Sequence, residues 1–217
     1  MDGSALQRKN MVESQVRPSD VTDRRITSAM MRIPREDFVP PALAPLAYID
    51  ETLVTGNGAA LLAPRDLARL IQFADVEEND KVLIVGTCGG YAAALLAGLC
   101  ARVTVFEAAM TASERLKQVY ARLSIDNVTI HSGPLNAGWK EGAPYNLIFI
   151  EGMIDAVSDA IGEQLAEGGR VVAIMPDNGV SRAVALVKSN GVFIRRNGFQ
   201  AAGPVVPGFS KKQAFEF

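Results

Sequence analysis

Short, continuous apolar runs alternate with amphipathic segments through the middle of the chain. Such runs predict strands that are buried on both faces, and the amphipathic spacing predicts the helices that cover them. The alternation therefore predicts an α/β fold, a doubly wound and mostly parallel sheet with helices on both faces. We expect strands at 81–85, 103–107, 128–131, 147–150 and 170–174, and helices at 91–100, 111–123 and 158–165.

The segment before this region has a different pattern. Apolar positions at helical spacing predict a helix over 17–33, which Pro34 ends. A turn-rich stretch follows at 40–64, and Pro64 suits the first position of another helix. We expect residues up to about 63 to form an N-terminal helical extension.

The C-terminal part predicts antiparallel structure. Apolar segments at 184–188 and 192–196 flank Ser189-Asn190-Gly191, which is a strong hairpin signal. A last short strand is expected at 213–217. Because no repeat or long linker divides the chain, we expect a single domain over residues 1–217.

Charge and targeting signals narrow the classes of function. Lys and Arg number 22 against 24 Asp and Glu, a net charge of -2 with no long like-charge block. This balance argues against nucleic acid as a partner. The N-terminal residues lack a hydrophobic signal segment, and the apolar runs are interrupted too often to span a bilayer. We expect a cytoplasmic protein that does not bind membranes.

Cysteine and histidine usage gives no sign of a metal site. Cys88 and Cys100 lack CxxC spacing, and His131 has no evident companion ligands. A disulfide framework or a bound zinc ion is therefore not expected.

A glycine-rich turn at the end of the first central strand indicates a ligand site. Gly86, Gly89 and Gly90 would lie at the carboxyl edge of the sheet, where a ligand can approach the backbone. Glu107 ends the next strand, about 20 residues further on. The acid that binds ribose hydroxyls in nucleotide sites has the same position and spacing. Taken alone it could equally be a solvated acid that begins a helix. Together with the glycine turn, Glu107 favours a nucleoside site.

Two other nucleotide sites can be compared with this spacing. A phosphate-binding P-loop needs Lys followed by Ser or Thr after its last glycine, whereas Tyr91 and Ala92 follow Gly90. A dinucleotide fingerprint needs GxGxxG, and residues 86–91 lack its second and third glycines. The P-loop is excluded, and a nicotinamide-dependent enzyme remains a runner-up.

The run VLIVGTCGGYAAALLA resembles the first motif of the protein-L-isoaspartate O-methyltransferases, which reads like VLEIGTGSGYQAAVLA. That family is a class I, Rossmann-like methyltransferase family. The resemblance implies S-adenosyl-L-methionine as cofactor and methyl transfer to the free carboxylate of L-isoaspartyl residues, as a repair of damaged proteins or peptides. It extends over nearly the whole chain, through IPREDFVP, AYID, Glu107, DNVTIHSG, AGW, APYNLIFIEG and QLAEGGRVV.

The same resemblance implies which residues bind the cofactor. The turn would line its methionine end, Glu107 would hold the ribose and Gly133 would lie near the adenine. Ile84 stands where the family has an acid, and Cys88 replaces the middle glycine of the turn, so both changes should weaken binding. The implied cofactor-binding residues are Gly86, Thr87, Cys88, Gly90, Tyr91, Glu107 and Gly133.

The acceptor side departs further from the family. Where members carry a loop resembling GQTISQP, this chain has GAALLAP at 58–64. Ala60 and Leu62 replace the threonine and serine, so no catalytic hydroxyl is carried over. The adenine region reads SGPL at 132–135 instead of the usual GDG, and Asn146 replaces an aspartate.

Each departure also has a purely structural interpretation. The GAALLAP loop could be an apolar lid, Cys88 a small buried residue, and His131 and Trp139 packing groups. Glu151 is the candidate compensating carboxylate, or an acid that begins a helix. Three hypotheses remain: an isoaspartyl methyltransferase, a catalytically inactive binding or regulatory protein of the same fold, and a transferase or binder for a different ligand.

Overall fold

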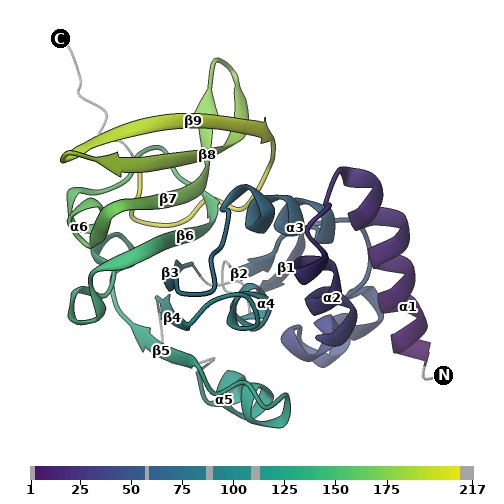
Figure 1. Cartoon of the computed structure of the whole chain (residues 1–217). Helices are drawn as coiled ribbons and strands as arrows, with labels where there is room; N and C mark the ends of the chain where they lie inside the picture. The colour runs from purple at the N-terminus through teal and green to yellow at the C-terminus, as the bar shows by residue number, and fades with distance from the viewer. Residues whose placement is uncertain (1–2, 57–58, 87–89, 109–112, 211–217) are drawn as a thin grey trace.

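The computed structural model describes residues 3–56, 59–86, 90–108 and 113–210, and within them a seven-stranded twisted sheet dominates (Figure 1). The strand order is β5-β4-β3-β6-β7-β8-β9, in which β5 to β7 are parallel and β8 and β9 are antiparallel. This arrangement confirms the predicted fold class. The strands are β3 (Lys81–Val85), β4 (Arg102–Glu107), β5 (Val128–Ser132), β6 (Tyr145–Met153), β7 (Leu165–Asp177), β8 (Val180–Ser189) and β9 (Val192–Gln200).

The central strands are buried on both faces, as their unbroken apolar runs predict. On β3, Val82 and Ile84 pack into one hydrophobic cluster, and Leu83 and Val85 pack into a second cluster on the opposite face. Successive side chains of a strand point to opposite faces, so a strand in the middle of a covered sheet must be apolar throughout.

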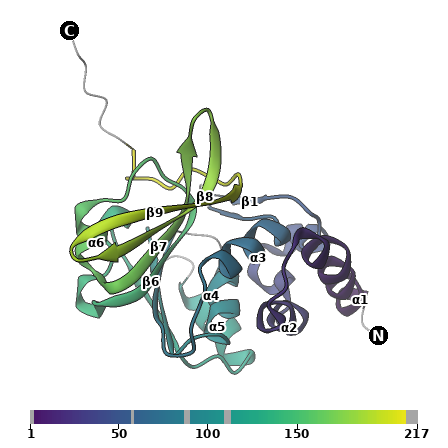
Figure 2. The ribbon, with the colours of Figure 1, turned by 45° about the horizontal axis from the view of Figure 1, so that its top comes forward.

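Helices lie on both sides of this sheet (Figures 1 and 2). The N-terminal helices lie on the side of α3 and α4, whereas α6 lies on the other side. No helix in the described ranges combines the length and apolar character that crossing a bilayer requires. The helices are α1 (Gly3–Met11), α2 (Arg24–Arg32), α3 (Pro64–Phe73), α4 (Tyr91–Ala97), α5 (Ser113–Arg122) and α6 (Asp159–Glu163).

The N-terminal segment differs from the prediction of one helix over 17–33. The chain is already helical from Gly3, continues through a π-helical turn (Val12–Val16) and a 3-10 turn (Arg17–Ser19), and then breaks. Helix α2 starts afresh because the Asp23 side chain accepts a hydrogen bond from the Arg25 backbone N–H, which caps its N-terminus. The predicted single helix is therefore wrong.

The stretch predicted to be turn-rich also holds regular structure. It contains a 3-10 turn (Pro41–Leu46), which follows another at Arg35–Phe38, and a small antiparallel pair formed by β1 (Leu53–Gly56) and β2 (Ala59–Leu61). Short strands of this kind carry too few residues for an alternating pattern to identify them.

The later elements agree with the prediction except at their ends. Helix α4 stops at Ala97 rather than residue 100, and α6 is shorter than 158–165. Strand β7 begins at Leu165, before the predicted start at residue 170, and passes through Gly168 and Gly169. The pairing of β7 with β6 shifts register between Tyr145 and Leu147, so the glycines are accommodated in an irregular part of the ladder.

The C-terminal hairpin is confirmed. Strands β8 and β9 pair in antiparallel register around Asn190 and Gly191, whose φ angles of 51° and 78° suit a tight hairpin turn. A second Asn-Gly turn, at residues 178 and 179, joins β7 to β8 in the same way. The strand expected at 213–217 lies outside the described residues.

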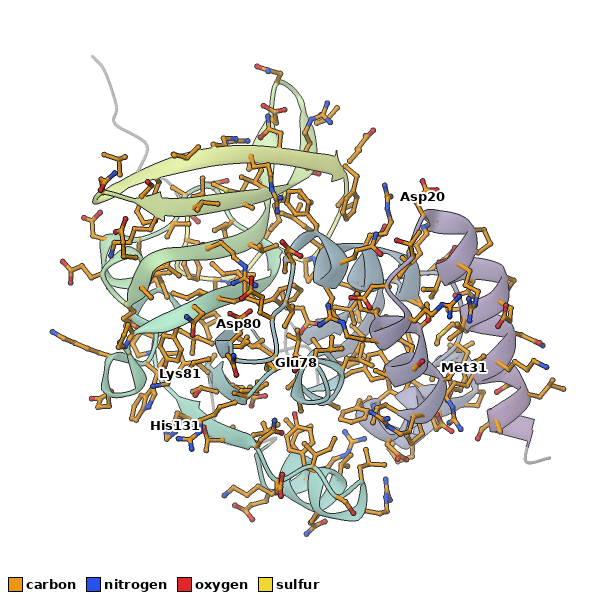
Figure 3. The ribbon with its side chains drawn as sticks, viewed as in Figure 1. Asp20, Met31, Glu78, Asp80, Lys81 and His131 are labelled. Carbon is orange, nitrogen blue, oxygen red and sulfur yellow. The ribbon has the colours of Figure 1, made fainter. Side chains whose placement is uncertain are left out.

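A buried ion pair holds the amino edge of the sheet, where Asp80 precedes β3 (Figure 3). Arg170 Nη2 lies 2.7 Å from Asp80 Oδ2, and the same guanidinium donates to the carbonyls of Ala74 and Asp75. Asp80 also accepts a hydrogen bond from the Glu77 backbone N–H. The pair thereby ties the end of α3 to β3 and β7.

We expect Asp80→Asn to lower the free energy of unfolding by about 2 kcal/mol, because it removes the charge partner of a shielded guanidinium. Urea denaturation measures this loss. Glu114→Gln serves as the control, since Glu114 is paired with Lys117 in solvent and should contribute at most about 1 kcal/mol. Equal losses in the two variants would contradict the assigned role of the buried pair.

Candidate functional site

Three of the candidate site residues from the sequence lie in one row, at the carboxyl ends of β4, β3 and β6. Val85 pairs with Phe106 on one side and with Ile150 on the other. The next residue is Glu107 after Phe106, Gly86 after Val85 and Glu151 after Ile150. Neighbouring strands lie about 4.8 Å apart, so the two glutamates flank Gly86 across the sheet edge.

Glu107 is a buried carboxyl group, with 2% of its surface exposed. Burial raises its pKa from the ordinary value of 4.5 to about 7, because an apolar environment disfavours the charged form. No hydrogen bond or ion pair to a described residue offsets this effect. Such a group suits a ligand that brings its own hydrogen-bond donors.

A hydrogen bond from Tyr120 fixes the start of α4. Gly90 caps the helix with a φ of 81°, and the Tyr120 hydroxyl donates to its carbonyl oxygen over 3.0 Å. A Cβ atom added to Gly90 would lie 2.7 Å from Leu116 Cδ2 and would also collide with the Tyr120 hydroxyl. The position therefore requires glycine for its backbone conformation and for space.

Tyr91 follows directly and points into the N-terminal layer. Its fully buried ring packs against Phe38, with ring centroids 5.5 Å apart, and under the guanidinium of Arg35. The Tyr91 side chain thus connects the turn to the segment that the IPREDFVP motif forms. Sequence reasoning gave Arg35 no role.

Arg35 is the charged residue that orders the segment carrying Ala60 and Leu62. Its side chain is 0% exposed, and it donates from Nε to the Ala47 carbonyl and from Nη2 to the Leu62 carbonyl, both over 2.7 Å. Ala60 and Leu62 are themselves buried. The apolar segment is packed into the core, as the structural interpretation of GAALLAP proposed.

Gly133 lies just beyond β5 and next to Glu107. Its backbone N–H donates to the Glu107 carbonyl over 2.9 Å, and an added Cβ atom would come within 2.9 Å of the Phe106 ring. Close by, His131 stacks on Trp139 with ring centroids 4.0 Å apart. Both rings therefore pack, as expected, and His131 lies in β5, which ends one residue later at Ser132 rather than at His131 (Figure 3).

The remaining residues singled out in the sequence are Ile84, Glu151, Thr87 and Cys88. Ile84 is a buried residue of β3, on the same face of the sheet as Val82. Glu151 lies inside β6, so the alternative that it begins a helix is wrong. Thr87 and Cys88 lie outside the described residues.

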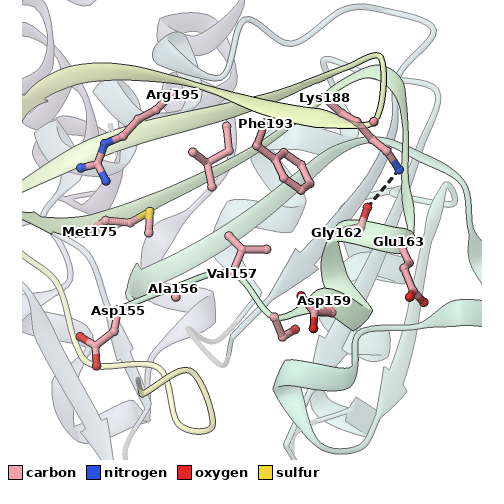
Figure 4. Close-up of a pocket in the computed structure, with 13 residues that line it drawn as sticks. Asp155, Ala156, Val157, Asp159, Gly162, Glu163, Met175, Lys188, Phe193 and Arg195 are labelled. Atoms are coloured by element: carbon pink, nitrogen blue, oxygen red, sulfur yellow. Dashed lines mark hydrogen bonds between the residues drawn. The ribbon is translucent and has the colours of Figure 1, made fainter. Parts of the chain in front are cut away.

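A separate groove of about 590 Å³ lies between α6 and the β8–β9 hairpin (Figure 4). Asp159 and Glu163 line one side, and Lys188, Phe193 and Arg195 the other. It contains none of the predicted site residues. Within the described part of the chain, no three potential ligands from His, Cys, Asp and Glu are grouped to hold a metal ion.

Comparison with known proteins identifies the family of the chain. The family model of protein-L-isoaspartate(D-aspartate) O-methyltransferase matches residues 6–202. A protein-L-isoaspartate O-methyltransferase of Geobacter metallireducens is 35% identical over 193 residues, covering 88% of this chain and 89% of its own length. One of Methanoculleus marisnigri is 34% identical over 190 residues, covering 88% and 86%.

Solved structures show the same fold. A protein-L-isoaspartate O-methyltransferase structure matches with a TM-score of 0.79 and 24% identity, covering 93% of this chain and 66% of that one. A structure described as a putative protein-L-isoaspartate O-methyltransferase from Plasmodium falciparum, in complex with S-adenosyl-L-homocysteine, matches with a TM-score of 0.76 and 16% identity, covering 95% and 99%. The chain belongs to the protein-L-isoaspartate (D-aspartate) O-methyltransferase family.

Proposed function

We propose that this protein uses S-adenosyl-L-methionine to methylate the free carboxylate of L-isoaspartyl residues in damaged proteins. The observation that carries the proposal is the family match over residues 6–202 together with relatives of that name at about 35% identity across most of both chains. Nothing in the fold or in these matches favours the inactive alternative.

The sheet edge fits such a cofactor. Glu107 is a buried carboxyl group that no described residue pairs with. Gly86 has a φ of 123°, which favours glycine and leaves the backbone without a side chain at this point of the sheet edge. We assign Glu107 to the ribose hydroxyls, Gly133 to the neighbourhood of the adenine and the turn to the methionine part. The assigned residues are Gly86, Thr87, Cys88, Gly90, Tyr91, Glu107 and Gly133.

The proposed reaction places modest chemical demands on the chain. The bound cofactor supplies a methyl group on a positively charged sulfur. The acceptor carboxylate has a pKa of about 3.5 and is ionised at neutral pH, so the protein needs no general base. Its residues therefore act by binding both partners and aligning the acceptor oxygen with the methyl carbon. Ala60 and Leu62 supply no hydroxyl group for this alignment.

The test measures transfer of a labelled methyl group from S-adenosyl-L-methionine to an isoaspartyl peptide. We expect incorporation into this peptide and none above background into its aspartyl counterpart. Glu163→Gln, an exposed residue of α6, is the control variant and should behave as the wild type. Equal labelling of both peptides would overturn the proposed acceptor, and failure of the protein to bind S-adenosyl-L-homocysteine at millimolar concentration would overturn the cofactor.

A further inference from the structure

Tyr120 is a buried residue of α5 whose hydroxyl group reaches the end of the glycine turn. The residue is 3% exposed, and its hydroxyl donates to the Gly90 carbonyl over 3.0 Å. The Ala94 backbone N–H donates to the same carbonyl over 3.1 Å, as the first hydrogen bond of α4. A side chain from a later helix therefore shares an acceptor with the backbone that starts α4.

The glycine turn has an anchor at each end. At its start, the Gly86 backbone N–H donates to the Phe106 carbonyl of β4 over 3.3 Å. At its end, Gly90 has a φ of 81°, and Leu116 and Tyr120 fill the space in which a Cβ atom would lie. The main chain at Gly90 thus packs directly on α5, and the tyrosine hydroxyl fixes the direction of its carbonyl.

Helix α5 is itself attached to the N-terminal layer. Arg115 Nη2 donates to the carbonyls of Asp37 and Val39, over 2.9 and 2.5 Å. The Tyr120 ring also packs near the ring of Phe38, with centroids 6.2 Å apart. Because these contacts hold the helix and the ring, the hydroxyl group is presented to the turn in a defined position.

The hydroxyl group is the part of Tyr120 that packing alone does not explain. Phenylalanine would fill nearly the same space, whereas a buried hydroxyl is costly unless it finds a hydrogen-bond partner. Burial raises the pKa of Tyr120, and the charges of Glu107 and Glu151 raise it further. The phenol therefore stays protonated and acts as a donor to the carbonyl.

We propose that Tyr120 is a positioning residue for the cofactor, because its hydroxyl group holds Gly90, and with it the turn, in the arrangement that receives the methionine part. The inference rests on the proposed function, which assigns the turn to that part. Tyr120 acts through the backbone and does not touch the reacting atoms. Without the hydroxyl the Ala94 hydrogen bond remains, so the turn becomes looser but does not unfold. Order that must be gained on binding weakens the complex.

Tyr120→Phe removes the hydroxyl group and keeps the ring. By titration calorimetry, we expect this variant to bind S-adenosyl-L-homocysteine roughly 3- to 10-fold more weakly, the loss expected for one hydrogen bond between uncharged groups. The KM for S-adenosyl-L-methionine should rise by a similar factor. The kcat and the KM for the isoaspartyl peptide should stay unchanged, because the turn binds the cofactor equally in the ground state and in the transition state.

Tyr145→Phe is the matched control. The Tyr145 hydroxyl donates to the Trp139 carbonyl over 2.9 Å, and the residue begins β6, at the end of the strand opposite to the proposed site. Both variants lose a bond from a phenol to a backbone carbonyl, so urea denaturation should show similar losses of stability. We expect Tyr120→Phe alone to lose affinity for S-adenosyl-L-homocysteine.

Amide hydrogen exchange of the ligand-free protein gives a second readout, which does not depend on the cofactor. The Ala94 N–H shares its acceptor with the Tyr120 hydroxyl, so a looser Gly90 carbonyl should expose it more often. We expect its exchange to be several-fold faster in Tyr120→Phe than in the wild type. In Tyr145→Phe the same amide should exchange at the wild-type rate.

The outcomes separate the inference from the proposed function. If Tyr120→Phe binds S-adenosyl-L-homocysteine within twofold of the wild type, or if both variants weaken binding equally, the positioning role is overturned while the cofactor assignment stands. Unchanged exchange of the Ala94 amide in Tyr120→Phe also overturns it. If the wild type binds no S-adenosyl-L-homocysteine at millimolar concentration, the proposed function is wrong and the inference falls with it.

Discussion

Replacing Glu107 by glutamine is expected to weaken binding of S-adenosyl-L-homocysteine by roughly 10- to 100-fold and to stabilise the ligand-free protein at alkaline pH. Burial raises the pKa of Glu107 to about 7, so the folded protein holds this proton more tightly than the unfolded chain, in which the pKa is near 4.5. The wild type therefore loses stability as pH rises from about 4.5 to about 7, by up to about 3 kcal/mol. Because glutamine cannot ionise, the variant should not lose this stability as the pH rises.

Urea denaturation of both proteins at pH 5 and pH 8 measures the effect. The free energy of unfolding of Glu107→Gln relative to the wild type should be larger at pH 8 than at pH 5. Glu163→Gln, in which an exposed carboxylate is lost, should show no such difference between the two pH values. If the free energies of unfolding of Glu107→Gln and the wild type changed equally between the two pH values, the buried carboxyl group would not be the one that titrates.

Replacing Arg35 by methionine is expected to lower the free energy of unfolding by about 3 to 5 kcal/mol. The side chain is fully buried, and its two hydrogen bonds satisfy the carbonyls of Ala47 and Leu62. Methionine fills much of the same space but leaves both carbonyls without these donors. Because Leu62 belongs to the segment beside the proposed acceptor position, methyl transfer should also fall.

The matched control is Arg17→Met, since Arg17 forms an exposed ion pair with Glu13 one helical turn away. Its loss should cost at most about 1 kcal/mol. Urea denaturation midpoints compare the two variants directly. A midpoint for Arg35→Met as high as that for Arg17→Met would show that the buried guanidinium contributes no more than a surface one.

The features that could be predicted from the sequence are those that depend on local pattern. Buried parallel strands are apolar throughout, so the β3 and β4 runs were recognisable, and Asn190-Gly191 marks a turn by its backbone preference alone. Glu107 was recognisable because it follows such a run. Each of these signals is complete within a few neighbouring residues.

The rest depends on contacts between distant segments. Arg35 is buried because carbonyls far along the chain accept its hydrogen bonds, which hydrophobic patterning cannot indicate. Glu151 was a candidate from the sequence, but its position beside Gly86 depends on the register in which β6 pairs with β3. The α1 helix is mostly exposed, with Met11 as its buried residue, so its pattern of apolar positions was weak. The register and the capping at Asp23 appear only in the folded chain.

The burial of Glu107 has a consequence for the energetics of ligand capture. Near neutral pH the empty site retains its proton on a substantial fraction of molecules, because the pKa of the carboxyl group is about 7. Ribose hydroxyls bound to Glu107 as proposed would favour the ionised form of the carboxylate. We therefore expect binding of the nucleoside to release a proton, and the heat of binding to depend on the ionisation enthalpy of the buffer that takes it up.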